Sequence, residues 1–325
     1  MENREARRLG RSFGVVGLGC WQLGADWGQV DEADALAVLH AAADAGVNFF
    51  DTADVYGDGR SESLVGRFLE ERGGEGITVA TKMGRRVDQV PENYTGENFL
   101  AWNDRSRRNL GVDTIDLVQL HCPPTPVYSA DEVFDALDSM VESGRIGAYG
   151  VSVETAQEAL TAIARPGVAS VQIILNALRH KPLERVLPAA AEAGVAIIAR
   201  VPLASGLLSG RYTADTSFGA DDHRNYNRAG EAFDVGETFS GVPYDTGLAA
   251  VERLRPLVPG EASMAQFALR WILDQPQVTT VIPGARNPEQ ARANAAAAAL
   301  APLTSHDEVR AVYDELVRPV VHDRW

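Results

Sequence analysis

Residues 48–57 of the chain read Asn48-Phe49-Phe50-Asp51-Thr52-Ala53-Asp54-Val55-Tyr56-Gly57. A short apolar run that ends in an acid, with glycines close on both sides, is typical of a buried strand that runs out into a loop. We therefore expect Asp51 at the carboxyl end of the strand and Tyr56 on the loop. A carboxylate at the end of a buried strand is costly unless a cation meets it, so a cation should lie nearby in space.

The next two apolar runs, residues 77–82 and 114–121, end in Lys82 and His121. Lys82 has the same position relative to its strand as Asp51 has to its own, so we expect it to be the counterion. Each of these side chains alone has an ordinary structural explanation, such as a helix cap, a solvated strand end or a core imidazole. Together they favour a catalytic site at the carboxyl-terminal rim of a parallel sheet. Three of them, Asp51, Lys82 and His121, end successive strands, and Tyr56 lies on the loop after Asp51.

Short apolar runs alternate with amphipathic helical patterns from residue 14 onward, which predicts a (β/α)8 barrel, the TIM-barrel fold. The predicted strands are 14–17, 47–51, 77–82, 115–121, 146–151, 168–173, 195–200 and 278–282. The predicted helices are 31–45 (with Asp31 as N-cap and Gly46 just past its end), 61–72, 97–110, 129–143, 154–164, 183–193, two within 244–275 that break at Pro259-Gly260, and 288–299.

Three further features complete the predicted architecture, which we interpret as one domain over residues 1–325. Residues 8–12 suggest an N-terminal hairpin that covers the bottom of the barrel. The stretch 210–242 has no periodic pattern and is too long for a plain connection, so it is expected to be a functional loop after the seventh strand. Residues 304–320 predict a C-terminal helix on the outside of the barrel.

An open dinucleotide-binding sheet is the main alternative fold, and the sequence argues against it. Such a sheet needs a glycine-rich phosphate turn after its first strand. Residues 17–22 read Gly-Leu-Gly-Cys-Trp-Gln and lack the third glycine of that turn. Trp21 would also be bulky where the backbone must approach a pyrophosphate.

Composition narrows the class of protein. The chain has 325 residues, 45% of them hydrophobic and 23% charged, and no apolar run approaches the length of a bilayer span. No signal peptide is evident at residues 1–5, so we expect a cytoplasmic protein with no membrane partner. Cys20 and Cys122 are too few for a disulfide framework or a metal cluster, so no metal is expected. A formal charge of -15 argues against a nucleic-acid partner.

With these residues in place, the sequence resembles the aldo-keto reductase superfamily over nearly its whole length. The motifs that carry the resemblance are Phe-Asp-Thr-Ala-Asp-Val-Tyr-Gly at 50–57, Ser-Glu-Ser-Leu-Val-Gly at 61–66, Thr-Lys at 81–82, Leu-His at 120–121, Gly-Val-Ser at 150–152, Pro-Leu-Ala-Ser-Gly-Leu-Leu-Ser-Gly at 202–210 and Ile-Pro-Gly at 282–284. Gly-Val-Ser-Val at 150–153 and Arg-Val-Pro-Leu at 200–203 are similar to a bacterial branch of the family.

The resemblance implies reduction of an aldehyde or ketone, a small-molecule carbonyl substrate, by hydride transfer from a nicotinamide cofactor. Tyr56 is then the general acid that protonates the alkoxide. Because a free phenol titrates near pH 10, a neighbouring ammonium is needed to stabilise its anion, and the resemblance gives that role to Lys82. Asp51 would hold the ammonium, and His121 would orient the carbonyl or share the proton.

The resemblance also implies a set of cofactor contacts. Ser152 and Gln172 match positions that hold the nicotinamide carboxamide, whereas Val153 stands where many relatives have Asn. Arg200 replaces an aromatic ring that stacks on the nicotinamide, a role that a planar guanidinium can also fill; its ordinary alternative is a surface salt bridge. The expected cofactor contacts are Trp21, Asp51, Ser152, Gln172, Arg200, Pro202, Leu203, Ser205, Gly206, Leu207, Gly284, Arg286, Gln290 and Asn294.

Arg286 is a reasonable ligand of the 2′-phosphate, so NADPH is favoured over NADH. The segment 203–210 is expected to lie over the pyrophosphate through its backbone N–H groups. Trp21, Trp27 and Val55, with the long loop, are expected to build the substrate pocket.

Two other functions fit parts of the sequence. Relatives of this fold include potassium-channel β subunits, so a cofactor-binding redox sensor or partner subunit with little turnover is the first alternative. A barrel hydrolase with Asp51 and Asp54 as paired carboxylates is the second, and it predicts activity on glycosides without a cofactor. Turnover of added aldehydes with NADPH separates the reductase from the sensor, and NADPH binding without activity on glycosides would dispose of the hydrolase.

Overall fold

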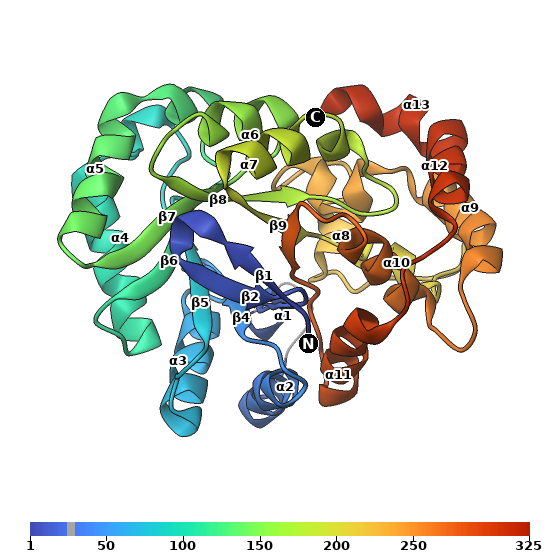
Figure 1. Ribbon diagram of the computed structural model, residues 1–325, viewed down its shortest axis with the longest axis horizontal. Coiled ribbons are helices and arrows are strands. Elements are labelled where there is room, and N and C mark those ends of the chain that lie inside the picture. Colours follow the sequence, from blue (N-terminus) through green and yellow to red (C-terminus); the bar gives the residue numbers. More distant parts are fainter. Residues whose placement is uncertain (25–29) are drawn as a thin grey trace.

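The computed structural model describes residues 1–24 and 30–325. Within these residues, eight parallel strands run in chain order from β3 to β10 around a barrel (Figure 1). Single parallel bridges from Val16 to Val281 and from Gly19 to Gly284 join its first and last strands. The predicted (β/α)8 fold is therefore confirmed. The strands are Leu18–Gly19 (β3), Phe49–Asp51 (β4), Thr78–Met83 (β5), Ile115–His121 (β6), Ile146–Ser152 (β7), Val168–Ile174 (β8), Ala196–Arg200 (β9) and Val278–Val281 (β10).

The first barrel strand lies later in the chain than predicted, so the assignment to residues 14–17 was wrong. Gly14 instead ends β2 (Arg11–Gly14), which pairs antiparallel with β1 (Asn3–Ala6). Its N–H group donates to Asn48 Oδ1 at 2.7 Å, which ties the chain to the end of the barrel. The apolar pair before Gly17 looks like a strand in the sequence, but the ladder to β4 starts only at Leu18.

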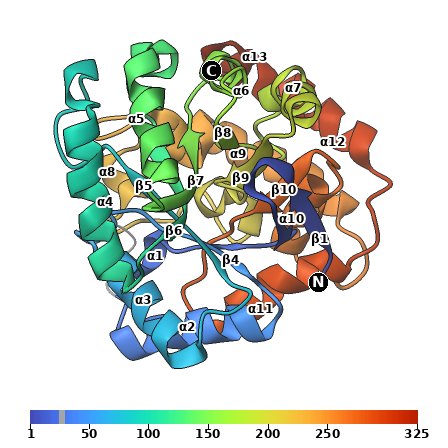
Figure 2. The ribbon, with the colours of Figure 1, turned by 60° about the vertical axis from the view of Figure 1, so that its left-hand side comes forward.

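Helices cover the outside of the barrel, as Figures 1 and 2 show. Asp31 caps the first long helix by accepting a hydrogen bond from the Ala33 N–H at 2.8 Å, as predicted. The region 244–275 forms two helices, also as predicted. The helices are α1 (Trp21–Gly24), α2 (Glu32–Asp44), α3 (Arg60–Arg72), α4 (Gly96–Leu110), α5 (Asp131–Glu142), α6 (Ala156–Ile163), α7 (Val186–Ala193), α8 (His223–Tyr226), α9 (Tyr244–Leu254), α10 (Met264–Leu273), α11 (Pro288–Ala296), α12 (His306–Val312) and α13 (Arg318–Val321).

The predicted N-terminal hairpin closes one end of the barrel. In Figure 1 its two strands cross the front of the barrel. The Phe13 ring is fully buried and lies 4.6 Å from the ring of Phe49, at the start of β4. Apolar side chains of the barrel interior pack around this pair, including Leu117 and Ile198. Because apolar side chains fill this end, the carboxyl ends of the strands are where we look for a ligand site.

The long connection after β9 and the C-terminal elements are both present. The connection carries α8 and two 3₁₀ turns, Val235–Glu237 and Phe239–Gly241. The predicted C-terminal helix consists of α12, a π-helical turn at Tyr313–Val317, and α13. These elements lie on the outside of the barrel beside α9 (Figure 1).

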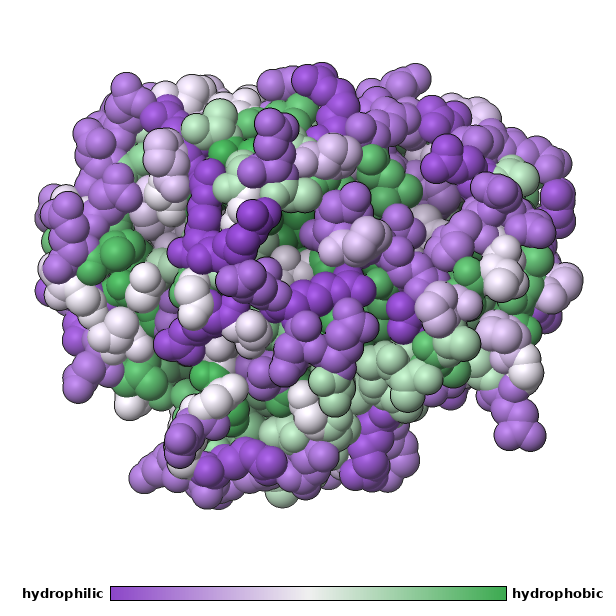
Figure 3. All heavy atoms as spheres, in the orientation of Figure 1, coloured by the Kyte–Doolittle hydropathy of each residue, from purple (hydrophilic) through white to green (hydrophobic). Residues whose placement is uncertain are grey.

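The face of the molecule that carries the hairpin is largely hydrophilic. Figure 3 shows it in the orientation of Figure 1, with hydrophobic areas that are small and scattered. None of the described helices combines the length and the apolar character needed to cross a membrane.

Candidate active site

Lys82 lies between Asp51 and Tyr56 at the carboxyl end of the barrel. Its Nζ is 2.5 Å from Asp51 Oδ1, 2.8 Å from the carbonyl oxygen of Thr52 and 3.2 Å from Tyr56 Oη. An ammonium has three N–H donors, so each one has an acceptor here. The side chains of Lys82 and Asp51 are only 1% and 3% exposed. Removing either partner would leave the other as an uncompensated buried charge.

Two amides hold the second carboxylate oxygen of Asp51. Gln172 Nε2 donates to Asp51 Oδ2 at 2.8 Å, and Gln119 Nε2 donates to it at 3.2 Å. Gln172 was predicted only as a contact of the cofactor, whereas the structure shows that it holds Asp51. Gln119 was not predicted, although it precedes His121 by two residues and alternate residues of a strand share one face.

Burial sets the protonation of the central pair. It raises the pKa of Tyr56 above its ordinary value, and the nearby Lys82 ammonium only partly offsets this. Burial also lowers the pKa of Lys82, but Asp51 and Tyr56 raise it to a value above the ordinary one. Lys82 thus lowers the pKa of the Tyr56 hydroxyl, as expected, but by less than burial raises it. At neutral pH the hydroxyl keeps its proton and the amine keeps its charge.

His121 ends β6 and faces Tyr56. Their ring centroids are 5.9 Å apart and the rings are nearly perpendicular, at 85°. Burial and the positive charges of Arg85 and Lys82 lower the pKa of His121 well below its ordinary value. His121 Nδ1 is buried and has no hydrogen-bond partner among the described residues. A neutral imidazole carries one N–H donor, so His121 can offer a hydrogen bond without carrying charge.

Trp21 forms a wall beside Tyr56. The two rings are stacked at 5.9 Å with an angle of 21°, and the His223 ring, from α8, lies 4.9 Å from Trp21. His223 was not predicted, but it confirms that the long connection reaches the site. Val55 is half-buried and does not line the cavity described next. Trp27 lies outside the described residues.

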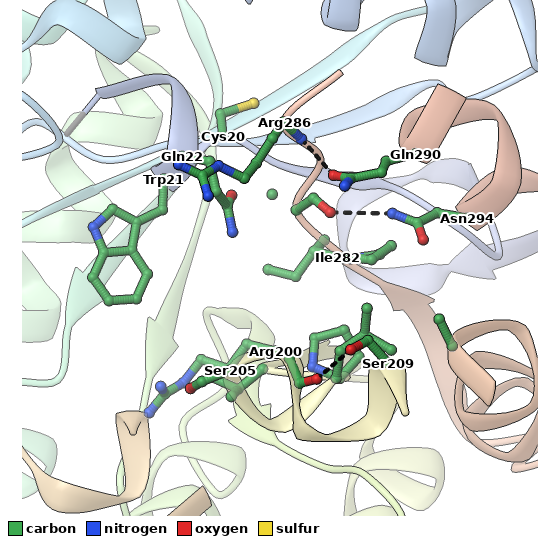
Figure 4. Close-up of a pocket in the computed structure, with 18 of the residues that line it drawn as sticks. Cys20, Trp21, Gln22, Arg200, Ser205, Ser209, Ile282, Arg286, Gln290 and Asn294 are labelled. Carbon is green, nitrogen blue, oxygen red and sulfur yellow. Dashed lines mark hydrogen bonds between the residues drawn. The ribbon is translucent and has the colours of Figure 1, made fainter. Parts of the chain in front are cut away.

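A cavity of about 390 Å³ opens beside these side chains (Figure 4). It brings together nearly all of the predicted cofactor contacts. Leu207 is the exception, because its side chain is 1% exposed and packs in the hydrophobic core. The predicted residues that line the cavity are Trp21, Asp51, Tyr56, His121, Ser152, Gln172, Arg200, Pro202, Leu203, Ser205, Gly206, Gly284, Arg286, Gln290 and Asn294. Unpredicted ones include Gln22, Ser209, Tyr212, Arg224 and Glu237.

Arg200, at the end of β9, is held by two carboxylates. Its Nη1 is 2.5 Å from Glu237 Oε2, and its Nη2 is 3.0 Å from Glu154 Oε2. The side chain of Arg200 is 7% exposed, so this is a buried ion network and not a surface salt bridge. Although burial acts to lower the pKa of Arg200, Glu237 and Glu154 raise it well above its ordinary value. The guanidinium is thus permanently charged and fixed at the cavity wall.

The sequence family follows from comparison with known proteins. A protein-family model described as "Aldo/keto reductase family" matches residues 15–313 of the chain. The chain belongs to this family. Aldo-keto reductase YhdN of Bacillus subtilis is 31% identical over 299 residues, which cover 90% of this chain and 87% of that protein. Aldo-keto reductase yakc, NADP(+), of Schizosaccharomyces pombe is 30% identical over 295 residues, which cover 86% and 82% of the two chains.

Other similar proteins extend the comparison. A probable voltage-gated potassium channel subunit beta of Oryza sativa subsp. japonica is 28% identical over 333 residues, covering 95% of this chain and 94% of that one. Among solved structures, aldo-keto reductase AKR11C1 from Bacillus halodurans, in its holo form, is similar with a TM-score of 0.78 and 27% identity. That match covers 100% of this chain and 99% of the other.

In this aldo/keto reductase the segment after β9 has an unusual backbone. Val201, Ala204, Ser205 and Gly206 have φ angles of 51°, 46°, 53° and 96°. Such a conformation costs about 1–3 kcal/mol for each non-glycine residue, so it persists only where the surroundings impose it. Turns of this kind form concave groups of N–H donors that suit an anion. At Gly206 a Cβ would lie 2.2 Å from the Tyr212 hydroxyl, so the turn requires glycine.

The other end of the cavity lies at the start of α11. Gln290 Oε1 accepts a hydrogen bond from the Arg286 N–H at 2.9 Å, and Asn294 Nδ2 donates to the Gly284 carbonyl at 3.1 Å. Figure 4 shows both contacts. The Gln290 and Asn294 side chains therefore shape the turn that carries Arg286. The Arg286 side chain itself is exposed at the cavity rim.

Proposed function

We propose that this reductase converts an aldehyde or ketone into an alcohol with NADPH, and that Tyr56 is the general acid. One observation carries the proposal: Lys82 Nζ bridges Asp51 and Tyr56, and both of these residues line a cavity that His121 also lines. The cofactor supplies the hydride when it is bound. The protein must then supply a proton to the alkoxide and hold the carbonyl in place.

The proton comes from the Tyr56 hydroxyl, which burial keeps protonated at neutral pH. As that proton leaves, the tyrosinate is stabilised by the ammonium 3.2 Å away. Asp51 holds the ammonium in place from the opposite side, and Gln119 and Gln172 hold Asp51. The chain thus keeps the donor and its stabilising charge in one fixed geometry before any substrate arrives.

His121 orients the carbonyl in this proposal. As a neutral imidazole it donates one N–H to the carbonyl oxygen without competing with Lys82 as a second cation. Its ring stands nearly perpendicular to that of Tyr56, so both groups can approach one oxygen from different directions.

The residues of the cavity fit a dinucleotide. Ser152 and Gln172 are register partners on β7 and β8 and could hold the nicotinamide carboxamide. The concave turn at 201–206 suits a pyrophosphate. Arg286 stands beside the first N–H groups of α11, where both favour an anion such as the 2′-phosphate. NADPH is therefore preferred to NADH, in line with the NADP(+) in the name of the yeast relative.

The test is an assay of NADPH oxidation, followed by absorbance, with a panel of aliphatic, aromatic and sugar carbonyl compounds. At least one compound should be turned over at a rate typical of enzymes, about 1–1000 per second. NADPH binding measured in parallel by calorimetry separates a wrong substrate panel from a wrong cofactor. Absence of binding for both NADPH and NADH would contradict the proposal.

A partner subunit with little turnover is the second candidate, because one relative is named as a potassium channel subunit beta. This function predicts tight NADPH binding together with slow reduction of every aldehyde in the panel. The hydrolase alternative is weaker, since the Asp54 carboxylate is buried and does not line the cavity with Asp51. Burial, chiefly, raises the pKa of Asp54 to about 7.

A further inference from the structure

Residues 234–241 of the long connection, which we call the strap, are fastened by Trp325. The indole Nε1 donates to Asp234, 3.0 Å from Oδ1 and 3.2 Å from Oδ2. Gly241 packs against the same ring, since a Cβ there would lie 2.2 Å from the indole. The Arg179 guanidinium lies 3.7 Å from the ring centroid and also donates to the Ser240 carbonyl at 3.2 Å. Trp325 therefore contacts the strap at both of its ends.

The strap also carries Glu237 to the wall of the cavity. Asp234 Oδ1, which holds the indole, accepts a hydrogen bond from the Gly236 N–H at 2.7 Å and so caps the 3₁₀ turn Val235–Glu237. The Glu237 carbonyl accepts from Ser205 Oγ at 3.0 Å, and its carboxylate pairs with Arg200 at 2.5 Å. The Asp234 carboxylate thus links the indole to the turn that presents Glu237.

We propose that Trp325 is a positioning residue for the cofactor cavity, acting through Asp234 and Glu237 on Arg200. Trp325 does not line the cavity, so any effect on the cavity has to pass through the residues that the indole contacts, namely the strap and Arg179. Without the indole, the strap loses one hydrogen bond at Asp234 and the surface against which Gly241 packs. Glu237 then holds Arg200 less firmly. The name of the ligand, NADPH, rests on the function proposed above.

The charge balance of the ion network makes this proposal specific. Arg85 pairs with Glu154 at 3.3 Å, so Arg85 and Arg200 balance Glu154 and Glu237. Withdrawal of Glu237 leaves one net positive charge beside the expected nicotinamide. The ring is cationic in NADP⁺ and neutral in NADPH. Loosening the strap should therefore weaken binding of NADP⁺ more than binding of NADPH, which a general loss of packing would not do.

The first test compares three single variants by calorimetry with both cofactors. Trp325→Ala should weaken NADP⁺ binding about tenfold, a usual scale for coupled neighbours, and NADPH binding by less. Trp325→Phe keeps a ring against Gly241 and should lose only part of that affinity. Asp323→Asn is the matched control, since its side chain is 98% exposed on the same tail, and it should behave as wild type. Equal losses for both cofactors in Trp325→Ala would overturn the proposal.

The second test asks whether the effect passes through Glu237. Glu237→Gln removes the charge and keeps the shape, so it should show the same preference for NADPH. Adding Trp325→Ala to Glu237→Gln should then weaken NADP⁺ binding by no more than about twofold, because coupled residues are not additive. A full tenfold loss in this background as well would show that Trp325 acts by another route.

Amide hydrogen exchange of the protein without cofactor gives an independent reading. Exchange at 235–241 should be faster in Trp325→Ala than in wild type and Asp323→Asn, while exchange in the barrel strands stays the same. Unchanged exchange at the strap contradicts the proposal even if cofactor affinity falls. A wild type that binds neither cofactor contradicts the proposed function, and the exchange result still decides whether Trp325 holds the strap.

Discussion

Lys82 shows why a lysine, and not an arginine, suits the centre of this site. A compact ammonium has three donors, and here they reach one carboxylate, one carbonyl and one phenol oxygen. The planar fork of an arginine matches two oxygens of one carboxylate and would not converge on a separate phenol in the same way. The shape of the cation thus decides that Asp51 and Tyr56 are linked through a single atom.

Tyr56→Phe keeps the ring beside Trp21 and removes only the proton donor. We expect kcat for reduction to fall by at least about 10²- to 10⁴-fold, the usual contribution of general acid catalysis. The dissociation constant for NADPH should change little, because the phenol is proposed to act on the substrate oxygen. Steady-state kinetics and calorimetry on the same preparation measure both quantities. A rate close to that of wild type would remove Tyr56 from the mechanism.

The pH dependence of reduction should lack a histidine step. The pKa of His121 is lowered well below 6.5 and that of Tyr56 is raised above 10.0. Both groups therefore keep one protonation state between about pH 6 and 9, given their ordinary titration ranges. We expect kcat/KM to be flat over this range and to fall only on the alkaline side. An acidic step near pH 6.5 that disappears in His121→Asn would refute the assignment of a neutral imidazole.

The same shift of His121 has a consequence for stability. Its folded-state pKa is lower than its unfolded-state pKa, so the unfolded chain binds the proton more readily. The free energy of unfolding should therefore fall as the pH decreases through 6.5. Above that pH His121 is neutral in both states, so this proton linkage costs no stability.

At the scale of elements, the strand ends were predictable and the first strand was not. The pattern places Asp51, Lys82 and His121 correctly because each closes a short, largely apolar run, and parallel strands end on one side of a sheet. Val15 and Val16 form an equally apolar pair, yet among residues 1–24 and 30–325 it joins the barrel only through the single bridge from Val16 to Val281. Whether this apolar pair becomes a barrel strand depends on where the preceding hairpin ends. The local sequence pattern does not specify that position.

Arg286 stands where β10 leads into α11, and it tests the expected cofactor preference. Arg286→Ala should weaken NADPH binding by roughly ten- to a hundredfold, which corresponds to one charge-assisted contact, and barely change NADH binding. Wild-type affinity for NADPH should also fall as salt rises. Arg292→Ala is the control, because Arg292 lies on the same helix and pairs with Glu289 at 3.2 Å. Equal losses of affinity for both cofactors would instead show that Arg286 contacts the adenosine, which both cofactors share, or that it stabilises the fold.

At the scale of the whole molecule, the sequence predicted the residues that follow the barrel strands and missed those that the long connection and the C-terminal elements bring to the site. Residues that follow strands could be aligned with one another because the barrel repeats. Glu237 and Trp325 lie 88 residues apart in the numbering and belong to no repeated pattern. Their partners are set by how the long connection and the C-terminal elements fold over the barrel. Arg200 was therefore expected at the cavity, but its two carboxylate partners were not.

Burial of Lys82 also gives the folded molecule a chemical signature. The sequence contains only two lysines, Lys82 and Lys181, among many arginines. Lys181 has a side chain that is 28% exposed, whereas that of Lys82 is 1% exposed. An amine-acylating reagent should therefore label Lys181 in the native protein and spare Lys82, as peptide mass spectrometry can measure. Appearance of label on Lys82 would then report opening of the barrel, so that this buried amine serves as a probe of unfolding.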